Sequence, residues 1–155
     1  MFNNDSEYKV LVNEESQDNR IFTQIQKKVC WGLAKPIPGR DPSRWRLDPV
    51  GNPVLNNLRG CFGALCHEYD HIKPYSKGGP TSVYNCQVLQ TRVNRAKSDM
   101  DGPRMEFLKS SSVEMKSLTP EDMDQAEMAV YGNVSKEFKD YKVKVSKHAK
   151  EKSKL

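Results

Sequence analysis

The sequence predicts an α+β domain with polar termini. Two runs with strand-like alternation, "ALCHEYDHI" from residue 64 and "NCQVLQ" from residue 85, are followed by a segment with the composition of a short helix. The loop between them carries the glycines and prolines that a chain reversal needs. With 155 residues and a mean hydropathy of −0.79, the chain suits one compact domain with part of its length outside the core.

The N-terminal region divides into an arm and a helix. Residues 1–19 are acidic and have no apolar periodicity, so we expect a loosely attached arm without a secretory signal. The spacing of four apolar residues, with Lys27 and Lys28 off their face, predicts a helix over residues 20–34. The four are Ile21, Ile25, Val29 and Leu33. Prolines follow at once, and they end a helix because the residue before a proline avoids helical backbone angles.

A turn-rich segment precedes the first strand. "DPVGNPV" predicts a tight turn around Gly51-Asn52, flanked by short extended pieces at residues 45–47 and 54–55. Three arginines lie here beside Trp45. Two interpretations of them stay open: contacts with phosphates, or salt bridges to Asp41 and Asp48. The arginines are Arg40, Arg44 and Arg46.

Two helices are expected after the second strand. Thr91 is a plausible N-cap for a short helix that reaches about residue 99. Thr119 and Pro120 predict the start of a second helix, which Gly132 ends. Its thin apolar face suggests docking on the domain. That face consists of Met123, Ala126 and Val130.

The four cysteines carry no paired-ligand spacing. Cys30, Cys61, Cys66 and Cys86 include no C-x-x-C pair, and without a signal peptide we expect free, buried thiols rather than a disulfide framework. A zinc site from the last three with Cys30 or His67 stays open as a less favoured alternative.

Charge is concentrated in two regions. Residues 27–99 carry twelve basic and five acidic side chains, a net charge of +7, and residues 134–155 carry eight and three, a net charge of +5. A basic central domain is typical of proteins that bind a polyanion. We expect the lysine-rich tail to be solvated.

Asp70, His71 and Asn94 have the residue types that phosphodiester hydrolysis requires. A neutral histidine is the ordinary base near pH 7. A carboxylate and an amide oxygen form a hard oxygen site that leaves room for water and phosphate, which suits Mg²⁺ better than Zn²⁺. Because adjacent strand residues point to opposite faces, Asp70 and His71 can serve one site only if the strand ends or twists there.

The stretch "YDHIKPYSKGG…YNCQVLQTRVNRAKSD" resembles the HNH (ββα-metal) nuclease motif, and its last residues resemble the HNH domain of RNA-guided DNA nucleases. The resemblance extends roughly over residues 27–99. Family members with C-x-x-C pairs bind a structural zinc, but "LQTRVNRAK" has no cysteine, so the zinc-free form is expected. The matching positions are Asp70-His71, Pro74, Gly78-Gly79, Asn85 and Asn94, followed by Lys97.

The resemblance implies a role for each matching residue. His71 would be the general base, and Asp70 and Asn94 would hold one Mg²⁺ or Mn²⁺. Asn85 would bond across the loop and fix His71. The products would carry 5′-phosphate and 3′-hydroxyl ends. The flanking cations that could contact backbone phosphates are Lys73, Lys77, Arg92, Arg95 and Lys97.

The expected organisation is an N-terminal arm (1–19), a nuclease domain (20–103), a docking-helix region (104–133) and a basic tail (134–155). The expected partner is DNA, with RNA not excluded, and the extensions could bind a protein complex. The alternative is an HNH fold retained as a structural or nucleic-acid-binding subunit. An intracellular location is expected. The terminal "SKL" matches a peroxisomal address, with mitochondrion and nucleus also open.

Overall fold

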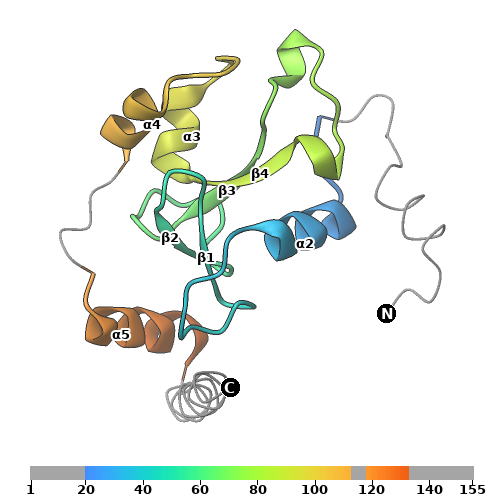
Figure 1. Cartoon of the computed structure of the whole chain (residues 1–155). Coiled ribbons are helices and arrows are strands. Elements are labelled where there is room, and N and C mark those ends of the chain that lie inside the picture. The colour runs from blue at the N-terminus through green and yellow to red at the C-terminus, as the bar shows by residue number, and fades with distance from the viewer. Residues whose placement is uncertain (1–19, 113–117, 133–155) are drawn as a thin grey trace, which may run out of the picture.

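The computed structural model describes residues 20–112 and 118–132. Within these ranges the chain is a mixed α+β structure with four α-helices and two antiparallel hairpins (Figure 1). The expected N-terminal arm and the basic tail with its "SKL" end lie outside the described residues. None of the described helices is long and apolar enough to cross a membrane.

Helix α2 (Gln24–Leu33) confirms the predicted helix and buries a face other than that of the four apolar residues. Ile21 and Leu33 are 65% and 70% exposed, whereas Gln26 and Cys30 are buried. The buried Gln26 amide donates to the carbonyl of Thr81 at 3.0 Å. Contacts with distant segments therefore select which face of this helix is buried.

Strands β1 (Trp45–Leu47) and β2 (Pro53–Leu55) form the first hairpin, which confirms the two predicted extended pieces. The carboxylate of Asp48 organises the turn by accepting from the backbone N–H groups of Val50 and Asn52. Its second oxygen accepts from the N–H of Gln90 at 3.0 Å. One buried carboxylate thus ties this hairpin to the next one.

Strands β3 (His67–His71) and β4 (Cys86–Gln90) form the second hairpin, and α3 (Thr91–Lys97) follows β4 directly. Both strands and the helix confirm the prediction. The N-cap prediction was wrong, because Gln90 occupies the cap position and makes no side-chain cap bond, while Thr91 lies buried inside the first turn.

The β3–β4 hairpin lies between α2 and α3 (Figure 1). Alternation along the strands assigns one face to each helix. Cys86 and Val88 pack in a core cluster with Cys30 and Trp31 of α2. Leu89, from the opposite face of β4, packs in a second cluster with residues of α3 and α4.

Helix α4 (Met105–Ser111) was not predicted from the sequence. It begins after Arg104, whose side chain makes no cap bond, and it buries only Leu108. This leucine packs against Val93 of α3 and Leu89 of β4. One buried residue gives too weak a periodic signal to identify a helix from sequence.

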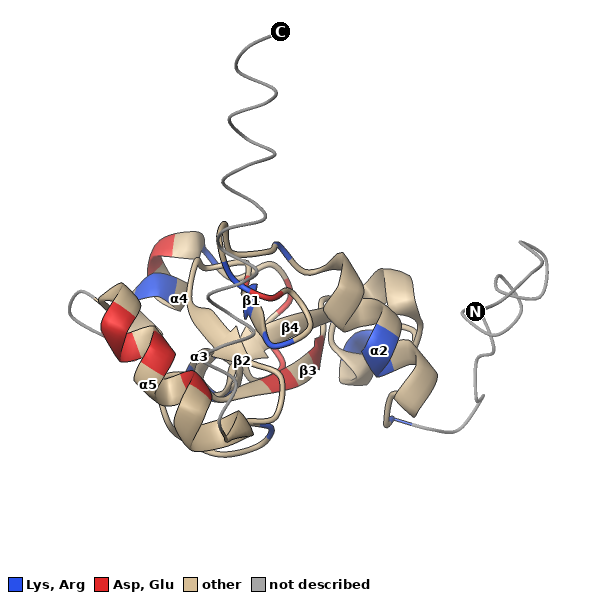
Figure 2. Cartoon of the chain, turned by 90° about the horizontal axis from the view of Figure 1, so that it is seen from below, with Lys and Arg blue, Asp and Glu red and all other residues tan. Residues whose placement is uncertain are grey.

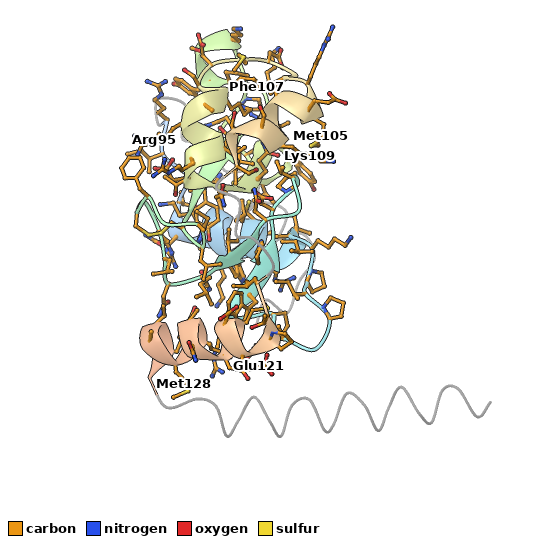
Figure 3. The ribbon with its side chains drawn as sticks, turned by 90° about the vertical axis from the view of Figure 1, so that its left-hand side faces the viewer. Arg95, Met105, Phe107, Lys109, Glu121 and Met128 are labelled. Carbon is orange, nitrogen blue, oxygen red and sulfur yellow. A yellow bond between two sulfur atoms is a disulfide. The ribbon has the colours of Figure 1, made fainter. Side chains whose placement is uncertain are left out.

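Helix α5 (Pro120–Tyr131) confirms the predicted start at Pro120 and end at Gly132, and Thr119 forms a capping box with Asp122. Figure 3 shows α5 at the opposite end of the molecule from α3 and α4. Glu127 is its only fully buried residue among those described. The predicted face of Met123, Ala126 and Val130 is half-buried, so the helix docks on the domain with a carboxylate at the centre of the contact.

The turn-segment arginines make the docking contacts of α5. Arg40 lies 2.6 Å from Asp124 and 3.8 Å from Glu127, and Arg44 lies 3.3 Å from Glu127. Arg44 also lies 3.8 Å from Asp41, which confirms part of the predicted local salt bridging. Arg46 donates to backbone carbonyls. These positions argue against a phosphate-binding role for the three arginines.

The cysteines divide into two kinds. Cys61 and Cys66 form a disulfide, so the expectation of free thiols was wrong for this pair, and neither sulfur is free for the alternative zinc site. Cys30 and Cys86 are free and buried, as predicted. The hydrogen bond between them and burial raise the pKa of Cys86, which keeps its thiol protonated.

Candidate active site

The predicted site residues line one cleft at the end of β3. Asp70, His71 and Asn94 all contribute to its wall, and its volume is about 390 Å³. Asn94 comes from α3, one turn before the helix ends. The hairpin and the helix that follows it therefore bring together residues 24 positions apart in the sequence.

Asp70 and His71 reach the cleft from opposite faces of β3. His71 pairs across the hairpin with Cys86 and faces α2, whereas Asp70 pairs with Gln87 and faces α3. The strand ends at His71. The cleft lies at this end of β3, where both side chains can contribute to it. The condition that the strand must end here for Asp70 and His71 to share one site is therefore met.

His71 is held by contacts on both sides of its ring. Its Nε2 lies 2.9 Å from Thr81 Oγ1, and its ring stacks on Phe22 with centroids 4.3 Å apart. Burial lowers the pKa of His71 below its ordinary value of 6.5. The charges of Arg20 and Lys97 lower it further, against the opposing effect of Asp70. The imidazole is therefore mainly neutral at pH 7.

The loop after His71 is fixed by Asn85. The Asn85 amide oxygen accepts from the N–H of Lys73 at 2.9 Å, and its nitrogen donates to the carbonyls of Lys73 and Pro80. Gly79 packs against this network so closely that a Cβ would lie 1.9 Å from the Lys73 oxygen. The expected bonding of Asn85 across the loop is present, and only glycine fits at position 79.

Asp70 is bound on one oxygen. Its Oδ2 lies 3.0 Å from Lys97 Nζ and accepts from Gln87 Nε2 at 2.9 Å. Lys97 Nζ also donates to the carbonyl of His71 at 3.0 Å. Among the described residues no donor occupies Asp70 Oδ1, which leaves this oxygen available as a ligand.

The amide of Asn94 is oriented by Glu68. Asn94 Nδ2 donates to Glu68 Oε2 at 2.7 Å, and Arg95 holds both carboxylate oxygens at 3.2 and 2.7 Å. A carboxylate can only accept here, so the NH₂ group must face Glu68 and the oxygen Oδ1 must face away from it. Asn94 therefore presents an oxygen rather than a donor to other partners.

The expected phosphate contacts occupy different environments. Lys73, Lys77 and Arg92 are exposed but do not line the cleft. Arg95 lines it and is exposed, although it pairs with Glu68. Lys97 is 2% exposed and pairs with Asp70, so it cannot act as the predicted surface contact.

Sequence reasoning missed the residues that support the site. Glu68, Gln87 and Thr81 hold Asn94, Asp70 and His71. A signal existed for Glu68, because it lies two positions before Asp70 on the same strand and must share its face. Thr81 carries no such signal, since a loop brings it to the histidine.

The donor chemistry fits a small hard cation with few protein ligands. Among the described residues there is no cluster of three or more His, Cys, Asp or Glu side chains placed to hold a metal. Asp70 and Asn94 instead offer one carboxylate and one amide oxygen, and Mg²⁺ commonly binds one or two protein oxygens and completes its shell with water and phosphate.

Comparison with known proteins gives no assignment. No protein-family model, no curated protein and no solved structure matches this chain.

Proposed function

We propose that the protein is a metal-dependent endonuclease of the HNH (ββα-metal) type that hydrolyses DNA phosphodiester bonds. The observation that carries the proposal is the cleft at the end of β3, which Asp70, His71 and Asn94 line together. A general base and two hard oxygen ligands in one open cleft are what this hydrolysis needs. The basic charge of residues 27–99 favours a polyanionic substrate.

His71 is proposed to take the proton of the attacking water. Its lowered pKa keeps it neutral. Nε2 faces Thr81, and when Nε2–H donates to the threonine oxygen, Nδ1 carries the free lone pair that can accept the proton. Stacking on Phe22 restricts rotation of the ring, which keeps the base oriented.

Asp70 Oδ1 and Asn94 Oδ1 are the proposed ligands for one Mg²⁺ or Mn²⁺. The chemistry such an ion supplies when bound is neutralisation of charge on the scissile phosphate and the leaving oxygen. Glu68 keeps the Asn94 oxygen turned away from itself, and Lys97 holds Asp70 by its other oxygen. Both ligand oxygens are thus oriented by hydrogen bonds of the protein itself.

The test is nicking of supercoiled plasmid DNA by the purified protein with Mg²⁺, Mn²⁺ or EDTA. We expect metal-dependent nicking that His71→Ala reduces by at least about 10²-fold, the lower range for loss of a general base. His148→Ala is the matched control, because it removes a histidine outside the predicted site and should leave nicking unchanged. Equal nicking by wild type and His71→Ala would refute the assignment of the base.

The pH dependence of nicking provides a second test. Only the neutral form of His71 can accept a proton, so the rate should fall as the pH drops through its pKa, which lies below 6.5. A rate that instead rises on acidification between pH 6.5 and 5 would contradict a histidine base.

A structural or nucleic-acid-binding subunit is the second candidate. One observation favours it: the carboxylate of Asp70 already pairs with the buried Lys97, so the site is held together without a metal. A folded protein that binds DNA but cuts it with none of these metals would support this candidate over the nuclease.

A further inference from the structure

A second cavity adjoins the candidate active site. Its volume is about 460 Å³, and five residues line both it and the cleft at the end of β3: Arg20, Tyr69, His71, Asn94 and Arg95. From there it extends along the side of the hairpin that faces α2, past Tyr69 to Gly60. The two hollows therefore meet at the proposed catalytic histidine.

The adjoining cavity is markedly basic. Four cations and one carboxylate line it, whereas two cations and two carboxylates, Asp70 and Asp99, line the cleft at the end of β3. The single carboxylate, Glu68, is already bound by Arg95 and Asn94. The four cations of the adjoining cavity are Arg20, Lys27, Arg59 and Arg95.

Three of these cations have no acidic partner. Within the described residues, no carboxylate pairs with Arg20, Lys27 or Arg59. Two of them lie over aromatic rings, Lys27 Nζ 5.9 Å from the Tyr69 centroid and Arg20 5.7 Å from that of Tyr75. A long cationic side chain that packs on a ring keeps its charge while losing freedom of movement. These cations remain available to bind phosphate.

Other cavities of the described structure have a different character. The hollow beside α4, of about 250 Å³, contains Lys35 and Lys109, but it also contains the carboxylate of Asp48. Figure 2 shows acidic residues along α5 and basic residues on α2. Of the three hollows compared, the one on the α2 side of the hairpin combines three unpaired cations with the proposed catalytic histidine.

We propose that this cavity binds phosphates of the DNA strand on one side of the bond that is cut. The proposal rests on the proposed nuclease function, and it adds a substrate-binding surface that includes Arg20, Lys27 and Arg59, all outside the previously expected phosphate contacts. Backbone contacts of this kind position a substrate without reading its sequence. The enzyme should accordingly bind DNA of any sequence through this surface.

The test compares two double variants of the full chain. Lys27→Gln/Arg59→Gln removes two cations of the cavity, and Lys35→Gln/Lys109→Gln removes two cations elsewhere. Figure 3 shows Arg95, which lines the cavity, and Lys109 on opposite edges of the view. Binding to a DNA duplex is measured in EDTA over a range of salt, so that cleavage cannot occur, and thermal unfolding confirms that each variant is folded.

The salt dependence of binding gives the expected magnitude. Each phosphate contact contributes about 0.9 to the slope of log K against log salt, so the cavity variant should lose about 1.8 from the slope. Between about 50 and 200 mM salt, this means that its affinity falls about 12-fold less than that of the wild type. Lys35→Gln/Lys109→Gln should keep the wild-type slope, as should the charge-conserving Lys27→Arg/Arg59→Lys.

A wild-type slope in the cavity variant, or an equal loss in both glutamine variants, would overturn the proposal. Because binding is measured without metal, the two proposals fail separately. If the wild type nicks plasmid but the cavity variant keeps the wild-type salt slope, the nuclease proposal holds and the proposed phosphate-binding surface is refuted. If the cavity variant has a reduced slope but the wild type does not nick plasmid, the phosphate-binding surface holds and the nuclease proposal is refuted.

Discussion

Lys97 should stabilise the fold through its buried ion pair with Asp70. The two side chains are 2% and 10% exposed and approach to 3.0 Å, and Lys97 also bonds the carbonyl of His71. Lys97→Met retains an unbranched chain and removes the charge. Asp70 is then left with the single hydrogen bond from Gln87. The variant thus isolates the contribution of a cation that the sequence alone would place at the surface.

The expected loss of stability follows from this burial. Removing one member of a buried pair typically costs about 3–5 kcal/mol, against about 0–1 kcal/mol for an exposed pair. Because Asp70 borders an open cleft, water can partly solvate its carboxylate, and we expect the lower end, about 3 kcal/mol. Domains of this size are usually stable by about 5–15 kcal/mol, so the variant should still fold.

Urea unfolding of four proteins measures the pair: wild type, Lys97→Met, Asp70→Asn and the double variant. The double variant should lose clearly less than the sum of the two single losses, because it leaves neither charge unpaired. Lys109→Met is the matched control at an exposed lysine and should change stability by less than about 0.5 kcal/mol. A loss below about 1 kcal/mol in Lys97→Met, or additive losses in the cycle, would refute the argument.

Three further predictions concern the same hairpin. Burial lowers the pKa of His67 to about 4, so protons bind preferentially to the unfolded chain. The free energy of unfolding should therefore fall by about 3 kcal/mol as the pH drops from 6.5 to 4. Urea titrations at several pH values should show that His67→Phe loses this dependence. Gly79→Ala should lower the stability of the protein by several kcal/mol, because its Cβ would overlap the Lys73 carbonyl. Gly102→Ala has open space around its Cβ, so thermal unfolding should show a smaller loss of stability. Glu68→Gln can turn an amide N–H toward Asn94, so the Mg²⁺ concentration for half-maximal nicking should rise. An unchanged metal requirement would remove Glu68 from the site.

Local signals in the sequence determined much of the secondary structure. The alternating runs predicted β3 and β4 because side-chain direction along a strand has a period of two. Thr119, Pro120 and Gly132 predicted α5 because capping depends on residues within one turn of a helix end. The residue types of Asp70, His71 and Asn94 indicated a site, since their chemistry is independent of the fold.

Only the tertiary structure decided which groups meet. In α2, Gln26 is buried and Ile25 is exposed, because a carbonyl of a distant loop accepts a hydrogen bond from the Gln26 amide. Lys97 is buried because β3 places the Asp70 carboxylate beside it. Arg40 is buried because α5, more than eighty residues later in the chain, packs against it through Asp124. Side-chain periodicity and capping are fixed by near neighbours in the chain. The ion pairs of Lys97 and Arg40, and the cleft at the end of β3, join segments that lie far apart in the sequence, and that separation carries no information about their distance in space.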